Sequence, residues 1–216
     1  MLHNLGQSNS LISHLVSELR DINIQNDRAR FRRNLGRIAG LIGFEISKQL
    51  PYVERDVTTP LAVAKCQVLR EIPVLATILR AGLAMHQGLL ELFEGAECAY
   101  ISAYRKHNKD GSFEIALEYI ACPDLTDKIL ILSDPMLGTG ASMVLTLKEL
   151  FKSWKPREIH TVSAIAARPG VEHVTKELPH VHIWTAAIDD ALNSKAYIVP
   201  GLGDAGDLAF GGKVQN

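Results

Sequence analysis

The sequence lacks the features that would assign it to a specialised class of protein. Its three cysteines, Cys66, Cys98 and Cys122, are widely separated and never form a CxxC pair, which argues against a disulfide framework and a structural zinc site. No apolar run reaches membrane-spanning length, and the N-terminus lacks the basic start and continuous apolar core of a signal peptide. We therefore expect a soluble, cytoplasmic protein with reduced, buried thiols.

An excess of charge of one sign is lacking as well. The chain has 23 basic and 24 acidic residues and a formal net charge of −1, so no overall field attracts nucleic acid or an anionic membrane. A basic stretch, RARFRRNLGR at residues 28–37, is interleaved with apolar helix positions. We interpret it as a solvated or subunit-facing helix surface, and any anion site must then be local.

The chain is long enough for one compact domain, since 47% of its 216 residues are hydrophobic. Apolar spacing predicts a first helix that ends near Arg20, capped by Ser8 or Asn9, and a second helix over residues 26–50. The second helix has one apolar stripe, which consists of Phe31, Leu35, Ile38, Ile42, Ile46 and Leu50.

After residue 73, short apolar runs alternate with helical patterns. We predict buried strands at residues 74–79, 98–104, 129–132, 160–167 and 181–188, and helices that end near 92 and cover 142–154 and about 171–178. Residues 104–120 are typical of a projecting β-hairpin with its turn at 108–111. The alternation predicts an α/β fold in which an open, mainly parallel sheet is flanked by helices.

The stretch ILILSDPMLGTGASM at residues 129–143 joins a buried strand to a helix through an acid and a turn of small residues. Ligands of open parallel sheets bind beyond the carboxyl ends of the strands. Backbone N–H groups of residues 138–142 can converge on an anion there, and the dipole of the following helix adds positive potential. A phosphate fits this turn, with hydroxyl donors from Thr139 and Ser142.

Two commoner phosphate motifs fit less well. The loop of nucleoside triphosphatases requires a lysine after Gly140, and Ala141 stands there. The dinucleotide fingerprint begins well with Gly138 and Gly140 but has Met143 where its third glycine belongs. Asp134, four residues ahead of the turn, can accept hydrogen bonds from vicinal hydroxyls. The site therefore predicts a phosphorylated pentose.

This strand, acid and loop resemble the phosphoribosyl-diphosphate (PRPP) binding motif of phosphoribosyltransferases, in the version found in the uracil phosphoribosyltransferase family. Three further stretches follow the family's order: ILRAGL at residues 78–83, YR at 104–105, and TAAID followed by YIVPGLGDAGD at 197–207. The helical start, SELRD followed by FR, also fits, so the resemblance covers most of the chain. The C-terminal signature is long and specific, whereas the TG and serine of the loop would alone be weak evidence for the family.

The resemblance implies transfer of the 5-phosphoribosyl group from PRPP to uracil, which gives UMP and pyrophosphate in pyrimidine salvage. It implies three catalytic residues: Asp134 at the ribose hydroxyls and the cationic ring, and Arg80 and Arg105 at the pyrophosphate. Arg105 would lie on a mobile arm. The implied 5-phosphate site consists of Pro135, Met136, Leu137, Gly138, Thr139, Gly140, Ala141 and Ser142.

The resemblance implies that Ile198, Gly203, Asp204 and Ala205 bind uracil, because small residues let a backbone loop match the donors and acceptors of the base. Asp204 would also face PRPP, through Mg²⁺ or water. No dedicated protein ligands for the metal are expected, since Mg²⁺ keeps several waters and binds substrate phosphates. The resemblance further suggests GTP as an allosteric activator. It also suggests a homodimer or homotetramer, and the apolar stripe of the second helix favours such an oligomer as well.

Some positions depart from the family pattern. The loop reads GTGAS where the family usually has ATGGS, which we expect to be tolerated if Ala141 has a negative φ as a first helical residue. Leu208 stands where a basic residue is usual, FGG replaces FGT, and ARPG at residues 167–170 replaces an APEG-like stretch. These departures bear on substrate affinity or regulation more than on the class of reaction.

Two alternatives stay open. A PRPP- or nucleotide-sensing regulatory protein of the same fold could contact nucleic acid through residues 28–37, or a phosphoribosyltransferase could act on another base. We expect a single phosphoribosyltransferase domain over residues 1–216, with a helical part at 1–50, a β-arm at 104–120 and a uracil-binding hood at 186–216. We expect His180 and His182 to be structural, and Trp154 and Trp184 to lie in the core or an interface.

Overall fold

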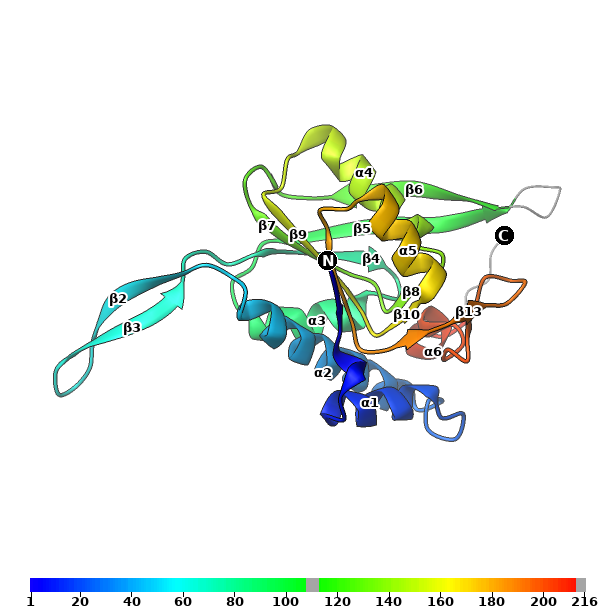
Figure 1. Cartoon of the computed structure of the whole chain (residues 1–216), viewed down its shortest axis with the longest axis horizontal. Coiled ribbons are helices and arrows are strands. Elements are labelled where there is room, and N and C mark those ends of the chain that lie inside the picture. Colours follow the sequence, from blue (N-terminus) through cyan, green and yellow to red (C-terminus); the bar gives the residue numbers. More distant parts are fainter. Residues whose placement is uncertain (108–112, 213–216) are drawn as a thin grey trace.

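A seven-stranded sheet forms the centre of the protein, in a computed structural model that describes residues 1–107 and 113–212 and omits the side chains of residues 103–118. The strand order is β1-β11-β9-β7-β4-β5-β6, and every pair is parallel except β5 with β6. The predicted open, mainly parallel sheet is confirmed (Figure 1). The strands are β1 (Leu2–Asn4), β4 (Val74–Leu79), β5 (Cys98–His107), β6 (Phe113–Ala121), β7 (Ile129–Ser133), β9 (Glu158–Ser163) and β11 (His182–Thr185).

Helices cover both faces of this sheet. Figure 1 shows α1 (Leu11–Arg20), α2 (Arg28–Ser47) and α3 (Leu83–Leu92) on one face, and α4 (Ala141–Ser153) and α5 (Arg168–Glu177) on the other. Because successive strand residues point to opposite faces, Ile129 and Ile131 pack with the first group of helices and Leu130 and Leu132 with the second. The near-continuous apolar runs of the central strands reflect burial on both sides.

The N-terminal helices differ from the prediction at their ends. The cap of α1 is Ser10 instead of Ser8 or Asn9, and its side chain accepts a hydrogen bond from the Ile12 N–H at 3.2 Å. Helix α2 begins after Asp27, whose carboxylate caps it, and ends at Ser47, before the predicted residue 50. All six residues of the predicted stripe are buried, so the stripe itself is confirmed.

Two predicted strands each divide in two. The run at 160–167 gives β9 and then β10 (Ile165–Ala167), and the run at 181–188 gives β11 and then β12 (Ile188–Asp189). The second halves leave the main sheet and form a three-stranded sheet in the order β12-β10-β8, where β8 is Met136–Leu137. An apolar run shows burial but not which strand it pairs with, so the division was not visible in the sequence.

Two hairpins project from the body (Figure 1). The predicted one is confirmed as β5 paired antiparallel with β6, although its turn at 108–111 lies outside the described residues. The other, β2 (Tyr52–Thr58) with β3 (Val63–Leu69), was not predicted. Strand β1 was also missed, because three residues carry too little pattern. The remaining elements are the 3-10 helix η1 (Leu5–Gln7), β13 (Ala191–Leu192), β14 (Ile198–Val199) and α6 (Ala205–Phe210).

The three cysteines are free and partly buried, not fully buried as expected. Trp184 is in the core with 2% of its surface exposed, and Trp154 is partly buried. His182 stacks on His3 with ring centroids 5.8 Å apart. Within residues 1–107 and 113–212, no helix has the length and apolar character needed to cross a membrane.

Candidate active site

Two neighbouring parallel strands, β4 and β7, end at the same carboxyl edge of the main sheet. The register places Thr77 opposite Ser133, so Arg80 follows one strand and Asp134 follows the other. Two buried hydroxyls join the strand ends: Thr77 Oγ1 donates to the Ser133 carbonyl at 3.3 Å, and Ser133 Oγ donates to the Ala76 carbonyl at 3.2 Å. The predicted acid and the predicted arginine therefore share one end of the sheet.

Asp134 lies where the chain leaves β7 and enters β8. Its backbone N–H donates to the Val162 carbonyl at 3.0 Å, and its Oδ1 accepts from the Met136 N–H at 3.4 Å. The following carbonyl, that of Pro135, accepts from the Ile165 N–H at 3.0 Å. Backbone bonds thus fix the half-buried acid at the strand tip, where a carboxylate can accept hydrogen bonds from sugar hydroxyls.

The turn after β8 presents the start of α4 to the same edge. Gly140 is the residue before the helix and has φ +76°, a conformation that a glycine adopts without strain. Thr139 Oγ1 accepts from the Ala141 N–H at 3.3 Å. Ala141 is the first residue of α4 and has a negative φ, so the condition for tolerating alanine there is met. Backbone donors and the helix dipole together suit a phosphate.

Helix α5 supports this turn from behind. A Cβ atom on Gly170 would lie 2.2 Å from the Gly138 carbonyl oxygen, and one on Gly140 would lie 2.8 Å from the Gly170 carbonyl oxygen. His173 Nδ1 lies 2.8 Å from the Thr139 carbonyl oxygen and donates to it. The glycine of ARPG, which the APEG-like family stretch also has, is therefore needed for close packing of the turn on α5.

Arg80 follows β4 through a cis Leu79–Arg80 peptide bond. Its side chain is 43% exposed, and Nη2 donates to Asp207 Oδ1 at 3.1 Å and to the Gly211 carbonyl at 3.3 Å. A Cβ atom on Gly82 would lie 2.2 Å from Thr77 Oγ1, so the loop lies directly on the strand ends. The arginine therefore points toward the C-terminal segment of the chain.

Arg105 belongs to β5, where it pairs with Ile115 of β6. Its side chain lies outside the described residues, so its predicted contact with pyrophosphate stays a prediction. Strand β5 is the neighbour of β4, which places the base of this arm beside the strand that leads to Arg80.

The four residues predicted to bind uracil lie within one short segment. Ile198 is buried in β14, Gly203 has φ +94°, and Ala205 begins α6 and is buried. Asp204 caps α6, and its Oδ1 accepts from the Asp207 N–H at 3.0 Å. The carboxylate is thus engaged at the helix N-terminus.

Packing brings this segment to both loops of the sheet edge. A Cβ atom on Gly138 would lie 3.6 Å from the Ala196 carbonyl oxygen and 3.9 Å from Ile198 Cγ1, so one methyl group would fill the space between the turn after β8 and this segment. A Cβ atom on Gly206 would lie 3.9 Å from Arg80 Nη2 and 3.8 Å from the Cβ of Ala81. Three stretches that are far apart in the sequence therefore meet at one place, as expected if they bind the parts of one pair of substrates.

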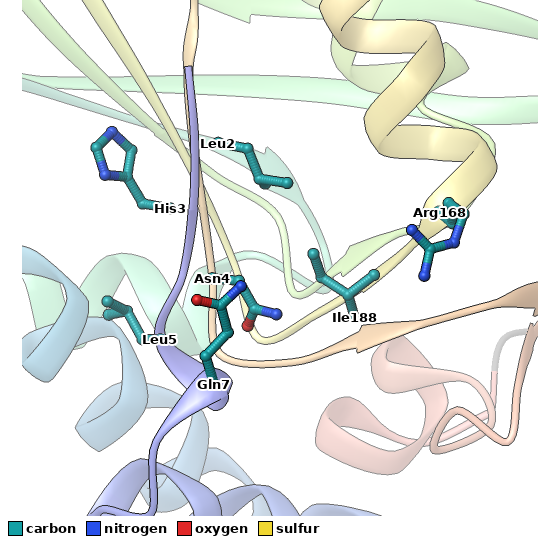
Figure 2. Close-up of a pocket in the computed structure, with 7 residues that line it drawn as sticks. All are labelled: Leu2, His3, Asn4, Leu5, Gln7, Arg168 and Ile188. Carbon is teal, nitrogen blue, oxygen red and sulfur yellow. The ribbon is translucent and has the colours of Figure 1, made fainter.

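A hollow of about 540 Å³ lies elsewhere, beside β1 (Figure 2). In Figure 2 the side chains of Leu2 and His3 lie on opposite sides of β1, and Ile188 and Arg168 lie across from that strand. Strands β11 and β9 separate β1 from β7, and none of the predicted site residues lines the hollow. We therefore locate the site by the strand ends and the chemistry there, not by this concavity.

The described residues contain no cluster of three or more histidine, cysteine, aspartate or glutamate side chains that could hold a metal ion. The carboxylates near the site are those of Asp134, Asp204 and Asp207, the last of which accepts a hydrogen bond from Arg80. This donor set fits Mg²⁺ only if substrate phosphates and water supply the other ligands, which is the coordination that Mg²⁺ prefers.

The basic stretch at residues 28–37 is partly engaged within the protein. Arg30 forms an ion pair with Glu18, and Arg32 Nη1 donates to the Ala209 carbonyl at 2.6 Å. The second contact ties α2 to the C-terminal segment. These internal bonds reduce the basic surface that is left for nucleic acid.

Comparisons with known proteins identify the chain. The family model for uracil phosphoribosyltransferase matches residues 6–212. A uracil phosphoribosyltransferase of Porphyromonas gingivalis is 50% identical over 212 residues, which cover 98% of this chain and 98% of that protein. One from Thermococcus gammatolerans is 35% identical over 213 residues, covering 97% and 93% of the two chains.

Solved structures agree with this result. The AQ2163 protein from Aquifex aeolicus has a TM-score of 0.87 and 31% sequence identity over 100% of both chains. Orotate phosphoribosyltransferase of Mycobacterium tuberculosis in complex with PRPP has a TM-score of 0.51 at 11% identity, covering 86% of this chain and 95% of that one, and so shares the fold. The chain belongs to the uracil phosphoribosyltransferase family.

Proposed function

We propose that the chain carries out its family's reaction at the edge formed by β4, β7 and the C-terminal segment. The reaction transfers the 5-phosphoribosyl group from PRPP to uracil and gives UMP and pyrophosphate, a step of pyrimidine salvage. The bond from ribose C1 to the pyrophosphate oxygen breaks, and a bond from a ring nitrogen of uracil to C1 forms. The nitrogen loses its proton, and the electron pair of the broken bond leaves with pyrophosphate.

The observation that carries this proposal is the meeting of three separate stretches at one sheet edge. Asp134 lies at the strand tip beside the turn that suits a phosphate, so a ribose with its 5-phosphate in that turn would place its hydroxyls near the carboxylate. The same negative charge stabilises the oxocarbenium character that develops on the ribose ring. The 5-phosphate contacts proposed for residues 135–142 follow from this placement.

We assign the pyrophosphate to Arg80 and Arg105, because a guanidinium can bond several phosphate oxygens at once as negative charge develops on the leaving group. The hydrogen bond from Arg80 to Asp207, three residues after Asp204, supports a base site next to the leaving group. Uracil would then lie against Ile198, Gly203, Asp204 and Ala205. Mg²⁺ bound through PRPP would neutralise part of the pyrophosphate charge, and Asp204 would face PRPP through Mg²⁺ or water.

The defining experiment is an assay of purified protein with Mg²⁺, PRPP and labelled uracil. We expect UMP to form, and cytosine, hypoxanthine and orotate tested in parallel should react far more slowly. Preference for another base would support the alternative of a different substrate, and absence of any nucleotide product would refute the enzymatic proposal. RNA binding that weakens steeply with salt would support a regulatory protein instead.

An Asp134→Asn variant tests the assigned role. The amide keeps the shape of the side chain but removes the charge that favours the transition state, so kcat should fall by about two to three orders of magnitude. The unfolding temperature should change little. A variant that keeps full kcat would show that Asp134 is not the acid at the ribose.

We further propose that the protein is a homodimer or a homotetramer and that GTP activates it. The β2–β3 hairpin supports an oligomer, because two strands alone bury little apolar surface and its tip residue Leu61 is 97% exposed. Exposed Val57 and Val63 on the same hairpin add to this surface. Sedimentation with and without GTP tests both proposals, and a monomer in both conditions would refute the oligomer.

The expected domain and location also stay proposals. We propose a single domain over residues 1–216 in which residues 186–216 form the uracil-binding hood and 104–120 the arm. A cytoplasmic location is favoured by the free state of all three cysteines. Labelling of the protein with a fluorescent tag in its own cell would test that location.

A further inference from the structure

Arg20, Asp189 and Gly201 form a closed set of hydrogen bonds that connects three separate parts of the chain. Arg20 Nη1 and Nη2 each lie 2.8 Å from one oxygen of the Asp189 carboxylate. The Gly201 N–H donates to Asp189 Oδ2 at 2.9 Å, and Arg20 Nη1 donates to the Gly201 carbonyl at 3.1 Å. The Arg20–Asp189 pair therefore binds both the backbone N–H and the backbone carbonyl of Gly201.

This ion pair is shielded from solvent. The Asp189 side chain is 7% exposed and that of Arg20 is 25% exposed. Burial alone would raise the pKa of Asp189, but hydrogen bonds from Arg20 and from the Gly201 N–H hold that pKa below its usual value. The carboxylate is thus charged when Gly201 is bound. Removal of either partner would leave a buried charge without compensation, which costs much more than loss of an exposed pair.

Gly201 has a conformation that only glycine fits. Its φ is +58°, and a Cβ atom there would lie 2.1 Å from the Ile198 carbonyl oxygen. The turn from Ile198 to Gly201 is therefore tight, and the Arg20–Asp189 pair sets where it lies. The uracil residues proposed above lie on both sides of this glycine, Ile198 before it and residues 203–205 after it.

The same pair is tied to the phosphate turn. Asp189 ends β12 and is paired in register with Ala167 of β10. Strand β10 in turn pairs with β8, where Leu137 directly precedes Gly138. One short three-stranded sheet thus joins the anchor of the uracil segment to the start of the phosphate turn. In the proposed function, the distance between uracil and PRPP would depend on that connection.

We propose that Arg20 and Asp189 are positioning residues for the nucleobase: they act through Gly201 to hold the uracil segment in register with the bound PRPP. The inference deepens the proposed function and rests on it. Neither residue touches the substrates. A loosened Gly201 would weaken the fit to uracil while leaving the 5-phosphate and pyrophosphate contacts in place, since those belong to the ends of β4 and β7, to Arg105 on β5 and to the start of α4.

Steady-state kinetics of Asp189→Asn and Arg20→Lys test this proposal. In Asp189→Asn the amide cannot pair with the guanidinium through two charged oxygens, so KM for uracil should rise about tenfold or more. KM for PRPP should stay within about twofold, because no phosphate contact is lost. Lysine keeps the charge but cannot make all three bonds of the arginine, so Arg20→Lys should raise KM for uracil by a smaller factor. Discrimination of uracil against cytosine should fall in the same order.

Asp190→Asn is the matched control. Asp190 is the next residue along the chain and also pairs with an arginine, Arg168, but the two side chains are 82% and 61% exposed. The same chemical change at an exposed pair should leave both KM values unchanged.

The outcomes of these kinetic experiments distinguish failure of the positioning role from failure of the proposed function. Wild-type protein that forms no UMP refutes the proposed function itself. An active wild type whose Asp189→Asn variant has both KM values raised together, or only a lower unfolding temperature, refutes the positioning role. If Asp189→Asn does not fold, folded Arg20→Lys decides: an unchanged KM for uracil and unchanged base discrimination overturn the proposal.

Discussion

Arg80 Nη2 donates a hydrogen bond to Asp207 Oδ1 across 3.1 Å, which joins the loop after β4 to helix α6. The arginine that we assign to pyrophosphate therefore already has an anionic partner within its own chain. Bound pyrophosphate and the Asp207 carboxylate would compete for the same guanidinium. The C-terminal segment is thereby coupled to the leaving-group site.

An Asp207→Asn variant should bind PRPP more tightly. The two side chains are 43% and 42% exposed, and exposed pairs contribute about 0.2–1 kcal/mol, so KM for PRPP should fall by up to about fivefold. The Asp207 N–H that bonds Asp204 is unaffected by the change. Initial rates at varied PRPP measure the effect, and a raised KM would show that Asp207 orients Arg80 for the substrate instead of competing with it.

Gly140→Ala should reduce stability and raise KM for PRPP, whereas Gly138→Ala should change neither. The space at Gly138 is open, with no atom closer than 3.6 Å to an added Cβ, and its φ is not positive. At Gly140 the φ is +76° and an added Cβ would lie 2.8 Å from the Gly170 carbonyl oxygen. The left-handed backbone alone costs about 1–2 kcal/mol for alanine. Thermal unfolding and KM for PRPP should change only in Gly140→Ala; equal effects in both variants would contradict this account of the turn.

Removal of Mg²⁺ should stop turnover without loosening the fold. We propose that the ion binds as part of the complex with PRPP, because Mg²⁺ prefers substrate phosphates and water as ligands. We expect EDTA to abolish UMP formation and to leave the unfolding temperature of the substrate-free protein unchanged. A lower unfolding temperature in EDTA would indicate a structural metal site.

Stability should fall in mild acid because of His160. Burial, followed by the nearby His182 and His3, lowers the pKa of His160 to about 3, from an ordinary value of 6.5. The unfolded chain therefore binds a proton that the folded chain refuses between these two values, and the free energy of unfolding should decrease as pH falls through that window. The Glu158 carboxylate, 3.0 Å from His160 Nε2, favours the charged ring but does not outweigh burial. Urea unfolding from pH 7 to pH 4 measures this slope.

The variant for this test is His160→Asn. Trp184 Nε1 donates to His160 Nδ1 at 3.1 Å, and the asparagine oxygen can accept that bond without titrating. The variant should be less stable at pH 7 but should lose less stability on acidification. His180→Asn, at an exposed position, is the control and should keep the wild-type slope. An unchanged slope in His160→Asn would assign the acid sensitivity to other groups.

Prediction from the sequence succeeded where one residue pattern has one physical cause. The stripe from Phe31 to Leu50 is buried because helical periodicity and burial coincide. The tip of β7 was visible because an apolar strand, an acid and small residues are adjacent in the chain. In contrast, the partners of Arg80 and Asp189 lie more than a hundred residues away, at Asp207 and Arg20. Such pairs depend on the folded topology, and the only sign of Asp189 was its place in TAAID.

The contact between α2 and α3 has a consequence for how loops at the sheet edge can be altered. An added Cβ on Gly88 would lie 2.0 Å from the Gly36 carbonyl oxygen, so the two helices meet backbone to backbone. At this crossing no side chain separates the two backbones, so any side chain added at Gly88 would force the helices apart. This backbone contact therefore fixes the position of α3 relative to α2, and with it the position of Arg80 just before α3. Redesign of substrate preference will have to come from the C-terminal segment that faces Arg80.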